Sequence, residues 1–223
     1  MTERFTERLR QRAAGIWDAQ FQHPFVRGIG DGTLQLDKFK FWLRQDYVFL
    51  TEYARLLALA AARSPDLTTM IRFATLLKET VETEMNLHRN YAAEFHISPE
   101  DLERESPAPT TRAYTDFLLR VATMGDFEEL AAALLPCMWA FSEIGQRLTV
   151  QSRPSDERYA KWIAMYSSPE FAELALWCRN LVDNLAAGLP ERDLLRLEGA
   201  FLTSSRYELR FWEMAWNMEQ WHV

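Results

Sequence analysis

The sequence predicts an all-α protein, and three observations support this prediction. Glycine and proline are scarce, with 8 and 9 of 223 residues. Apolar residues recur mostly at helical spacing rather than in the strict alternation of a β-strand. The segments between the expected helices are short, which favours antiparallel packing of neighbouring helices. We therefore expect a bundle of about eight helices in one domain that covers residues 1–223.

The first long helix follows the segment HPFVRGIGDGT, which we interpret as a glycine-punctuated turn. Asp66 can cap the next helix, and prolines at 107 and 109 interrupt the chain before another. Asp126 is a candidate cap for the helix after that. The expected helices in chain order are Leu36–Arg63, Leu67 to about His96, Thr110–Met124, Asp126–Gln151, Asp156–Tyr166, Pro169–Gly188 and Glu191–Trp221.

A proline lies in the middle of one expected helix, in the stretch DFEELAAALLPCMWAFSEIGQRL. Pro136 has no backbone N–H, and its ring clashes with the preceding turn. We therefore expect a kink immediately before Cys137.

Composition excludes several classes of function. The net charge of −7 and the lack of a basic stripe argue against nucleic-acid binding. No run approaches the roughly 18 apolar residues of a membrane span, and the N-terminal segment lacks the apolar core of a secretory signal. Two cysteines are too few for a disulfide framework. We expect a cytoplasmic protein with free thiols that binds neither nucleic acid nor membrane.

Cys137 is the first candidate for chemistry, because a thiolate with a lowered pKa is a strong nucleophile near neutral pH. The alternative is that Cys137 is a small buried hydrophobic residue. That structural interpretation suits Cys178 better, since it follows the apolar run LALW.

Two carboxylates also stand out. Asp46 shares one helical stripe with Trp42, Phe49 and Tyr53, so it should face the core, where a carboxylate must be hydrogen-bonded or protonated. The alternative for Asp46 is an ion pair with an arginine or a cap on another helix. Glu208 lies one turn from Phe211, and its alternative is a surface charge between two arginines. Tyr114 and Tyr166 are further candidates whose hydroxyls could point into the same cavity.

A metal site is the main competing chemistry. Glu84 and His88 lie four residues apart on one expected helix, with Glu79 a turn earlier, and helical bundles hold paired irons with such residues. No second carboxylate and histidine pair at ligand spacing occurs later in the chain. We therefore interpret Glu84 and His88 as a structural hydrogen bond or ion pair and expect no metal.

Six motifs occur in order along the chain: HPFVRGIGDGTL, FKFWLRQDYVFL, EMNLHR, ALLPCMW, KWI followed by Tyr166, and SSRYELRFW. With them the sequence resembles the TenA or thiaminase II family from about Trp17 to Trp221. The resemblance implies a haem-oxygenase-like bundle, a homotetramer, and no metal or organic cofactor. It also favours Cys137 as a nucleophile over the alternative of a small buried hydrophobic residue.

The resemblance also implies an activity and a set of site residues. The activity is hydrolysis of 4-amino-5-aminomethyl-2-methylpyrimidine, an aminopyrimidine from thiamin breakdown, or of thiamin itself, in salvage for thiamin biosynthesis. Cys137 corresponds to the nucleophile, and Asp46 and Glu208 correspond to the pair of carboxylates. The substrate-binding positions are Tyr114, Tyr166, Phe211, Phe49 and Phe141. At Phe49 and Phe141 the family tends to carry tyrosine, so two pocket hydroxyls are missing and substrate preference is open.

Two other classes of function compete with this one. An oxygenase on the same bundle, with two irons or without a cofactor, is the alternative enzyme. A binding or regulatory module is the alternative without catalysis, and such a module would not need a reactive thiol.

Overall fold

The computed structural model describes residues 4–221, and these residues form helices with no β-strand among them. They group into two compact units that alternate along the sequence. Unit 1 comprises the chain up to Leu34 and Glu128–Glu213, and unit 2 comprises Gln35–Phe127 and the chain from Met214. The all-α prediction is confirmed. One domain over residues 1–223 stays a prediction, and residues 1–3 and 222–223 lie outside the described part.

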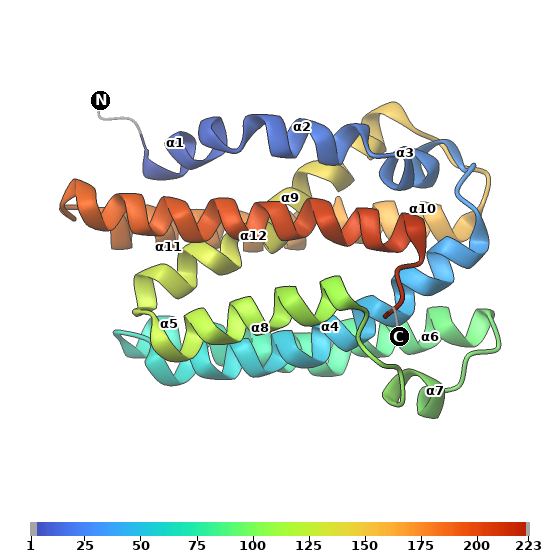
Figure 1. The fold of residues 1–223 in the computed structure, drawn as a ribbon, viewed down its shortest axis with the longest axis horizontal. Coiled ribbons are helices and arrows are strands. Elements are labelled where there is room, and N and C mark those ends of the chain that lie inside the picture. The colour runs from blue at the N-terminus through green and yellow to red at the C-terminus, as the bar shows by residue number, and fades with distance from the viewer. Residues whose placement is uncertain (1–3, 222–223) are drawn as a thin grey trace. The chain divides into compact units, whose positions relative to one another are not determined.

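Unit 2 is built around the long helix α4, Leu36–Arg63, whose bounds are those expected from the sequence. Figure 1 shows α4, α5 and α8 running side by side, and α4 also packs against α6. One face of α4 is buried along its length, and burial of such a face supplies most of a helix's stability in a protein. The other helical segments of unit 2 are α5 (Leu67–Glu79), η1 (Thr80–Glu84), α6 (Met85–Glu94), α7 (Pro99–Glu103) and α8 (Pro109–Met124).

The helix expected from Leu67 to about His96 is three segments in the structure. The Asp66 side chain caps the first, α5, as expected, by accepting from the Thr69 N–H at 2.9 Å. The second, η1, is a π-helix in which the Met85 N–H donates to a carbonyl five residues back. This wider turn shifts the register of α6, which follows it. His96 lies beyond α6 in the left-handed conformation, with φ of 60°.

Unit 1 contains the N-terminal helices and most of the C-terminal half of the chain. In Figure 1, α1 and α2 run alongside α12. Its helices are α1 (Phe5–Arg12), α2 (Ala14–Gln22), α3 (Pro24–Asp31), α9 (Phe127–Gln151), α10 (Glu157–Tyr166), α11 (Pro169–Ala186) and α12 (Glu191–Asn217). Residues 4–221 thus hold twelve α-helical segments rather than about eight, because α1, α2, α3 and α7 are too short to show a clear period.

The segment expected to be a glycine-punctuated turn is mostly helix. His23 caps α3 by accepting from the Phe25 N–H at 3.2 Å, and only Gly32, with φ of 78°, takes the left-handed conformation that ends it. Gly28 lies within α3, and packing favours glycine there, since a Cβ would lie 3.0 Å from the Leu34 Cβ. The glycine at this position therefore indicates a close approach between backbone segments rather than a turn.

Helix α9 runs without interruption from Phe127 to Gln151 and contains Pro136 in its interior. The proline therefore does not divide the helix. The kink expected next to Cys137 stays a prediction.

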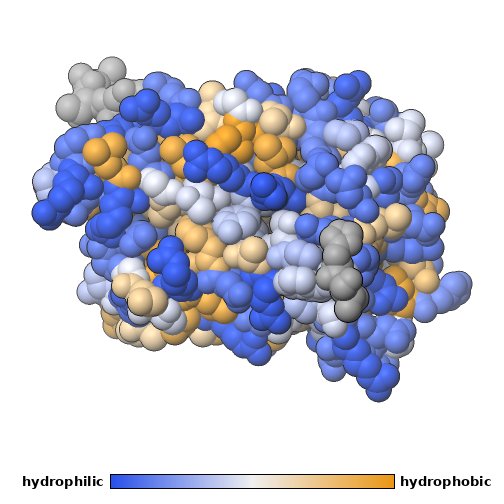
Figure 2. Space-filling view, in the orientation of Figure 1, coloured by the Kyte–Doolittle hydropathy of each residue, from blue (hydrophilic) through white to orange (hydrophobic). Residues whose placement is uncertain are grey.

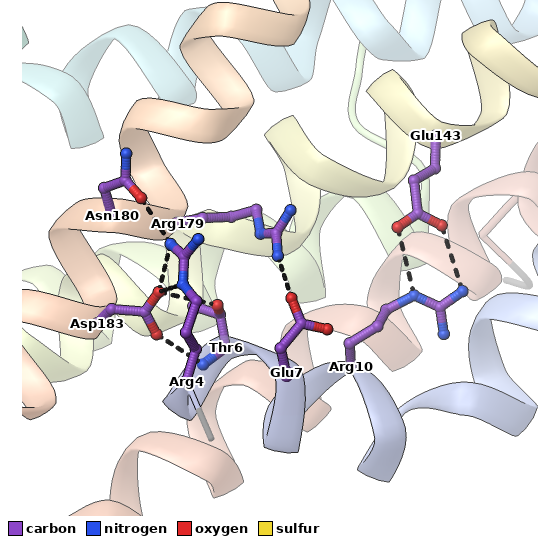
Figure 3. A network of polar contacts seen from close by, with 8 residues as sticks. All are labelled: Arg4, Thr6, Glu7, Arg10, Glu143, Arg179, Asn180 and Asp183. Atoms are coloured by element: carbon purple, nitrogen blue, oxygen red, sulfur yellow. Dashed lines mark hydrogen bonds and ion pairs between the residues drawn. The ribbon is translucent and has the colours of Figure 1, made fainter. Parts of the chain in front are cut away.

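A polar network fastens the N-terminal helix α1 to α11 and α9 within unit 1, as Figure 3 shows. Asp183 accepts from the Thr6 N–H at 2.8 Å, from the Thr6 hydroxyl at 3.0 Å and from Arg4 at 2.6 Å. Arg179 donates to Glu7. Because the Thr6 N–H lies in the first turn of α1, where no intrahelical acceptor exists, Asp183 takes the place of a cap.

Aromatic rings extend the same network into the interior of unit 1. The Arg10 guanidinium lies 4.4 Å from the centre of the Trp17 ring, and Arg179 lies 4.1 Å from that of Trp139. The two indole rings meet edge to face at 5.0 Å. Arg10 also pairs with Glu143 of α9 at 3.2 Å. Charge and apolar packing therefore hold α1 in one position.

The surface drawn in Figure 2 is predominantly hydrophilic, with smaller hydrophobic patches. Within residues 4–221, every helix is too short or too polar to span a bilayer.

We expect Asp183→Asn to lower the free energy of unfolding by about 1–3 kcal/mol, because it weakens a charged cap on buried donors. Urea unfolding followed by circular dichroism measures this loss. Glu173→Gln, on the exposed face of the same helix, is the matched control and should change stability by less than about 0.5 kcal/mol. Equal effects of the two substitutions would contradict the capping role.

Candidate active site

Unit 2 contains a carboxylate on the same helical stripe of α4 as several aromatic side chains. Asp46 is 5% exposed, and its neighbours on the stripe, Trp42, Phe49 and Tyr53, are buried too. Residues spaced by three and four lie on the same face of a helix. The expectation that Asp46 faces the core is confirmed.

The partner of Asp46 is a histidine rather than the arginine that the sequence suggested as an alternative. The distance from His88 Nε2 to Asp46 Oδ2 is 2.6 Å, and the His88 side chain is buried. The other ring nitrogen, Nδ1, lies 3.0 Å from the Glu84 carbonyl oxygen. Both nitrogens of the imidazole therefore have acceptors, which fixes the ring in one orientation.

Burial and charge act in opposite directions on His88. Burial by itself lowers the pKa of His88, but the hydrogen bond to Asp46 and the negative charges of Asp46 and Glu84 outweigh it, and the net pKa is raised. A carbonyl oxygen can only accept, so Nδ1 must carry a proton. Donation from Nε2 to a carboxylate then requires the doubly protonated imidazolium ring.

Glu84, at the end of η1, is the third ionisable group of this cluster. Burial raises the pKa of Glu84 to about 7, the positive charge of His88 opposes this rise, and the charge of Asp46 adds to it. The carboxyl group of Glu84 therefore changes charge near neutral pH, next to a permanently hydrogen-bonded pair.

Two further expected residues come together in unit 2. Tyr114, on α8, is buried, and its ring centre lies 5.1 Å from that of Phe49 at an angle of 34°. Phe49 stacks in turn on Tyr53 at 5.7 Å. Asp46, Phe49 and Tyr114 thus belong to one polar and aromatic cluster.

Unit 1 contains the expected nucleophile. Cys137 is partly exposed, whereas Cys178 is 3% exposed, and neither of them forms a disulfide. Solvent can therefore reach the first cysteine but hardly the second. This difference agrees with the structural interpretation of Cys178 and with a reactive interpretation of Cys137.

One helical turn after Cys137, Phe141 lies in an aromatic cluster. Its ring centre is 4.9 Å from that of Tyr166 and 5.0 Å from that of Trp212. Trp162 joins the cluster, 4.7 Å from Tyr166. The structure therefore brings Phe141 and Tyr166 into direct contact.

The position of Tyr166 depends on a glycine, Gly145, that the sequence pattern did not single out. A Cβ on Gly145 would lie 2.5 Å from the carbonyl carbon of Tyr166 and 2.7 Å from the Ser167 nitrogen. Only glycine allows α9 to approach the end of α10 this closely. Its signal in the sequence was a single glycine inside a helical pattern, one turn after Phe141.

The other two expected residues of unit 1, Glu208 and Phe211, lie on α12. Glu208 is 2% exposed and Phe211 is 3% exposed. The alternative that Glu208 is a surface charge is therefore wrong. It lies on the inward face of an amphipathic helix, where a carboxylate needs hydrogen-bonding partners.

The described residues contain no group of three histidine, cysteine, aspartate or glutamate side chains arranged as metal ligands. Of the candidate metal pair, His88 is hydrogen-bonded to the backbone carbonyl of Glu84 and forms its ion pair with Asp46.

Comparison with known proteins identifies relatives over nearly the whole chain. Residues 10–218 match the TENA/THI-4/PQQC family. A protein of Halalkalibacterium halodurans named an aminopyrimidine aminohydrolase is 47% identical, with 98% of each chain covered. A Bacillus subtilis protein of the same name is 39% identical, with 98% of this chain and 92% of the relative covered.

Solved structures agree with the sequence matches. A TenA homologue from P. horikoshii OT3 superimposes with a TM-score of 0.90 at 32% identity, covering 96% of this chain and 99% of the homologue. A Shewanella denitrificans domain of unknown function with a haem-oxygenase-like fold has a TM-score of 0.73 at 15% identity, with 96% and 92% covered. The prediction of a haem-oxygenase-like fold is confirmed.

We expect Gly145→Ala to lower the free energy of unfolding by about 1–3 kcal/mol, since the added methyl overlaps backbone that cannot move aside. Gly199→Ala is the matched control, because a Cβ there meets nothing within 4 Å. In a helix interior that change should stabilise by up to about 1 kcal/mol. Thermal unfolding compares the two, and a neutral Gly145→Ala would contradict the close approach.

A second prediction concerns pH. Because the folded protein raises the pKa of Glu84 from 4.5 to about 7, it keeps this proton while the unfolded chain loses it, and stability falls as pH rises through that window. Glu84→Gln removes this loss, so we expect its stability gain to be about 2–3 kcal/mol larger at pH 8 than at pH 5.

Urea unfolding at pH 5 and pH 8 measures the difference. The control is Glu82→Gln in the same π-helix, whose exposed side chain should make the substitution nearly neutral at both pH values. A gain from Glu84→Gln that does not depend on pH would contradict the raised pKa.

Proposed function

The chain belongs to the TENA/THI-4/PQQC family, and on this premise we propose that it is an aminopyrimidine aminohydrolase, a hydrolase acting on a carbon–nitrogen bond in thiamin salvage. The proposed substrate is 4-amino-5-aminomethyl-2-methylpyrimidine, and the products are the hydroxymethylpyrimidine and ammonia. The observation that carries the proposal is the likeness to relatives of that name along almost the entire length of both chains. Thiamin is a second proposed substrate.

In this proposal Cys137 is the nucleophile. Its thiolate adds to C6 of the electron-poor pyrimidine while a ring nitrogen takes up a proton, so the ring loses its aromaticity. Electrons then flow towards the exocyclic methylene, and its carbon–nitrogen bond breaks as ammonia leaves with a proton. Water adds to the methylene carbon and gives up one proton, and departure of the thiolate together with the proton on the ring nitrogen restores the aromatic ring. The partial exposure of Cys137 supports this role, because a reactive thiol must be reached by its substrate.

The two carboxylates have different roles in this mechanism. We assign Glu208 as the acid that supplies protons, because a protonated carboxyl can donate to a ring nitrogen while its other oxygen accepts from the amine. We assign Asp46 as the anchor for the substrate that also tunes the thiol of Cys137. Each side chain is buried within its own unit, where a carboxyl group is shielded from water.

The remaining residues form the walls of the proposed binding site. Aromatic rings suit a flat heterocycle, which they can stack against or enclose. Phe49 and Phe141 present hydrocarbon edges where tyrosines would present hydroxyls, so the pyrimidine meets fewer polar groups there. The rings in this role are Phe49, Tyr114, Phe141, Tyr166 and Phe211.

Three further features belong to the proposal on the strength of the resemblance and the composition. The protein assembles as a homotetramer, acts in the cytoplasm, and needs neither a metal nor an organic cofactor for this hydrolysis.

The test is ammonia release from 4-amino-5-aminomethyl-2-methylpyrimidine by metal-stripped protein, with thiamin as a parallel substrate. We expect Cys137→Ser to lower kcat by about 10³-fold or more, because the serine hydroxyl is a far weaker nucleophile here. The matched control is Cys178→Ser, which removes the buried thiol and should leave kcat within a few fold per folded molecule.

Each other outcome has a defined meaning. Turnover that survives in Cys137→Ser would contradict the nucleophile, and turnover that disappears on metal removal would favour an oxygenase or a metal-dependent enzyme. A folded protein that binds the pyrimidine without releasing ammonia would favour a binding module. Phe49→Tyr and Phe141→Tyr would then test whether the missing hydroxyls account for the loss.

A further inference from the structure

The Asp46 carboxylate has an unequal set of contacts. Oδ2 is bonded to His88 Nε2, and this is the only hydrogen bond that the carboxylate makes among residues 4–221. A carboxylate has about four lone-pair sites, and a purely structural pair in a protein interior normally satisfies both oxygens. Oδ1 is left to accept from something else.

Among the described residues, Asp46 has a hydrogen-bonding partner at only one of its oxygens, whereas His88 has partners at both of its ring nitrogens. Its Nδ1–H is bonded to the Glu84 carbonyl of the preceding π-helix, and its side chain is 2% exposed. The Trp42 ring, one turn before Asp46 on α4, lies 6.0 Å from the imidazole. An imidazole fixed at both nitrogens and packed against an indole can hold a carboxylate at one angle.

We propose that His88 is a positioning residue for the hydrolysis: it holds Oδ2 of Asp46, so that the carboxylate presents Oδ1 to the aminopyrimidine in one fixed orientation. The inference rests on the proposed function, since it gives Asp46 the anchoring role. It adds a residue outside the eight named as site residues, and it assigns the two nitrogens of His88 different tasks. Nδ1 fixes the ring, and Nε2 fixes the carboxylate.

The ionisable groups around the pair fit this role. Asp46 acts on the imidazole from α4, and Glu84 acts on it from the π-helix η1. Their negative charges, which Glu84 carries above about pH 7, favour the imidazolium form of His88. A hydrogen bond from an imidazolium to a carboxylate is roughly twice as strong as one between neutral groups. A pair of this kind resists rotation of the carboxylate when a ligand binds to its other oxygen.

Two variants of similar size separate the tasks of the two nitrogens. The amide nitrogen of His88→Gln can reach the place of Nε2 and keep the bond to Asp46. The amide nitrogen of His88→Asn corresponds to Nδ1 and keeps only the bond to the Glu84 carbonyl. Tyr91→Phe, a polar deletion at another buried position of α6, is the control.

The measurement is kcat and KM for 4-amino-5-aminomethyl-2-methylpyrimidine, with folding of each variant checked by circular dichroism. We expect His88→Asn to raise KM about tenfold or more, in the direction of Asp46→Asn, and to change kcat less. His88→Gln should stay within about threefold of the wild type, and Tyr91→Phe within about twofold. In the double variant with Asp46→Asn, His88→Asn should add nothing further, because it acts through the lost carboxylate.

Equal loss in the Gln and Asn variants, or effects that multiply in the double variant, would overturn the proposal and leave His88 a structural residue. Nitrogen NMR of the histidines supplies a second measurement, which needs only the wild-type protein and so does not depend on the folding of a variant. In wild-type protein at pH 7 both nitrogens of His88 should carry protons, and a neutral ring there would also overturn it. A wild-type protein without aminohydrolase turnover would instead overturn the proposed function, and this inference with it.

Discussion

The burial of a carboxylate inside unit 2 is the constraint on which much of this structure depends. Transfer of an isolated carboxylate from water to a protein interior is so unfavourable that it must be paired, protonated or coordinated. Asp46 meets this requirement with one short contact to His88. The helix that carries His88 must therefore lie at a fixed height and rotation against α4. The π-helix directly before it is the local feature that adjusts this register.

The helices that the sequence predicted well are those with long, regular apolar periods. Leu36–Arg63 was expected with its observed bounds because many turns repeat one buried face and a polar boundary follows it. Helix bounds were predicted less well where the apolar period is short or where a residue type, such as glycine, occurs in both turns and helices. Gly28 was read as part of a turn, although it serves helix packing, and the interruption at Thr80–Glu84 arises from backbone hydrogen bonding that periodicity does not encode.

The candidate site shows the same division between pattern and packing. The stripe that includes Asp46 predicted correctly that this side chain is buried, because helical spacing decides which residues share a face. The identity of its partner did not follow, since His88 lies on another helix and only tertiary packing brings the two together. Sequence context favoured Cys137 over Cys178, and the resemblance strengthened this choice. Gly145 was missed because its importance lies in a contact with the backbone of another helix.

The cluster around Asp46 also shows that this interior is not arranged for stability alone. A glutamine at position 84 would have nearly the same shape and would carry no ionisable proton. The glutamate, with its pKa raised by burial, lowers the stability of the fold as pH rises towards and above 7. The charge of Glu84 is thus unfavourable, and it lies beside the fixed imidazole of His88 and the carboxylate of Asp46. Proteins keep such locally unfavourable arrangements mainly at functional sites. Glu84 lies one helical turn from His88. Its charge therefore acts on the imidazole, and through the imidazole on the orientation of Asp46.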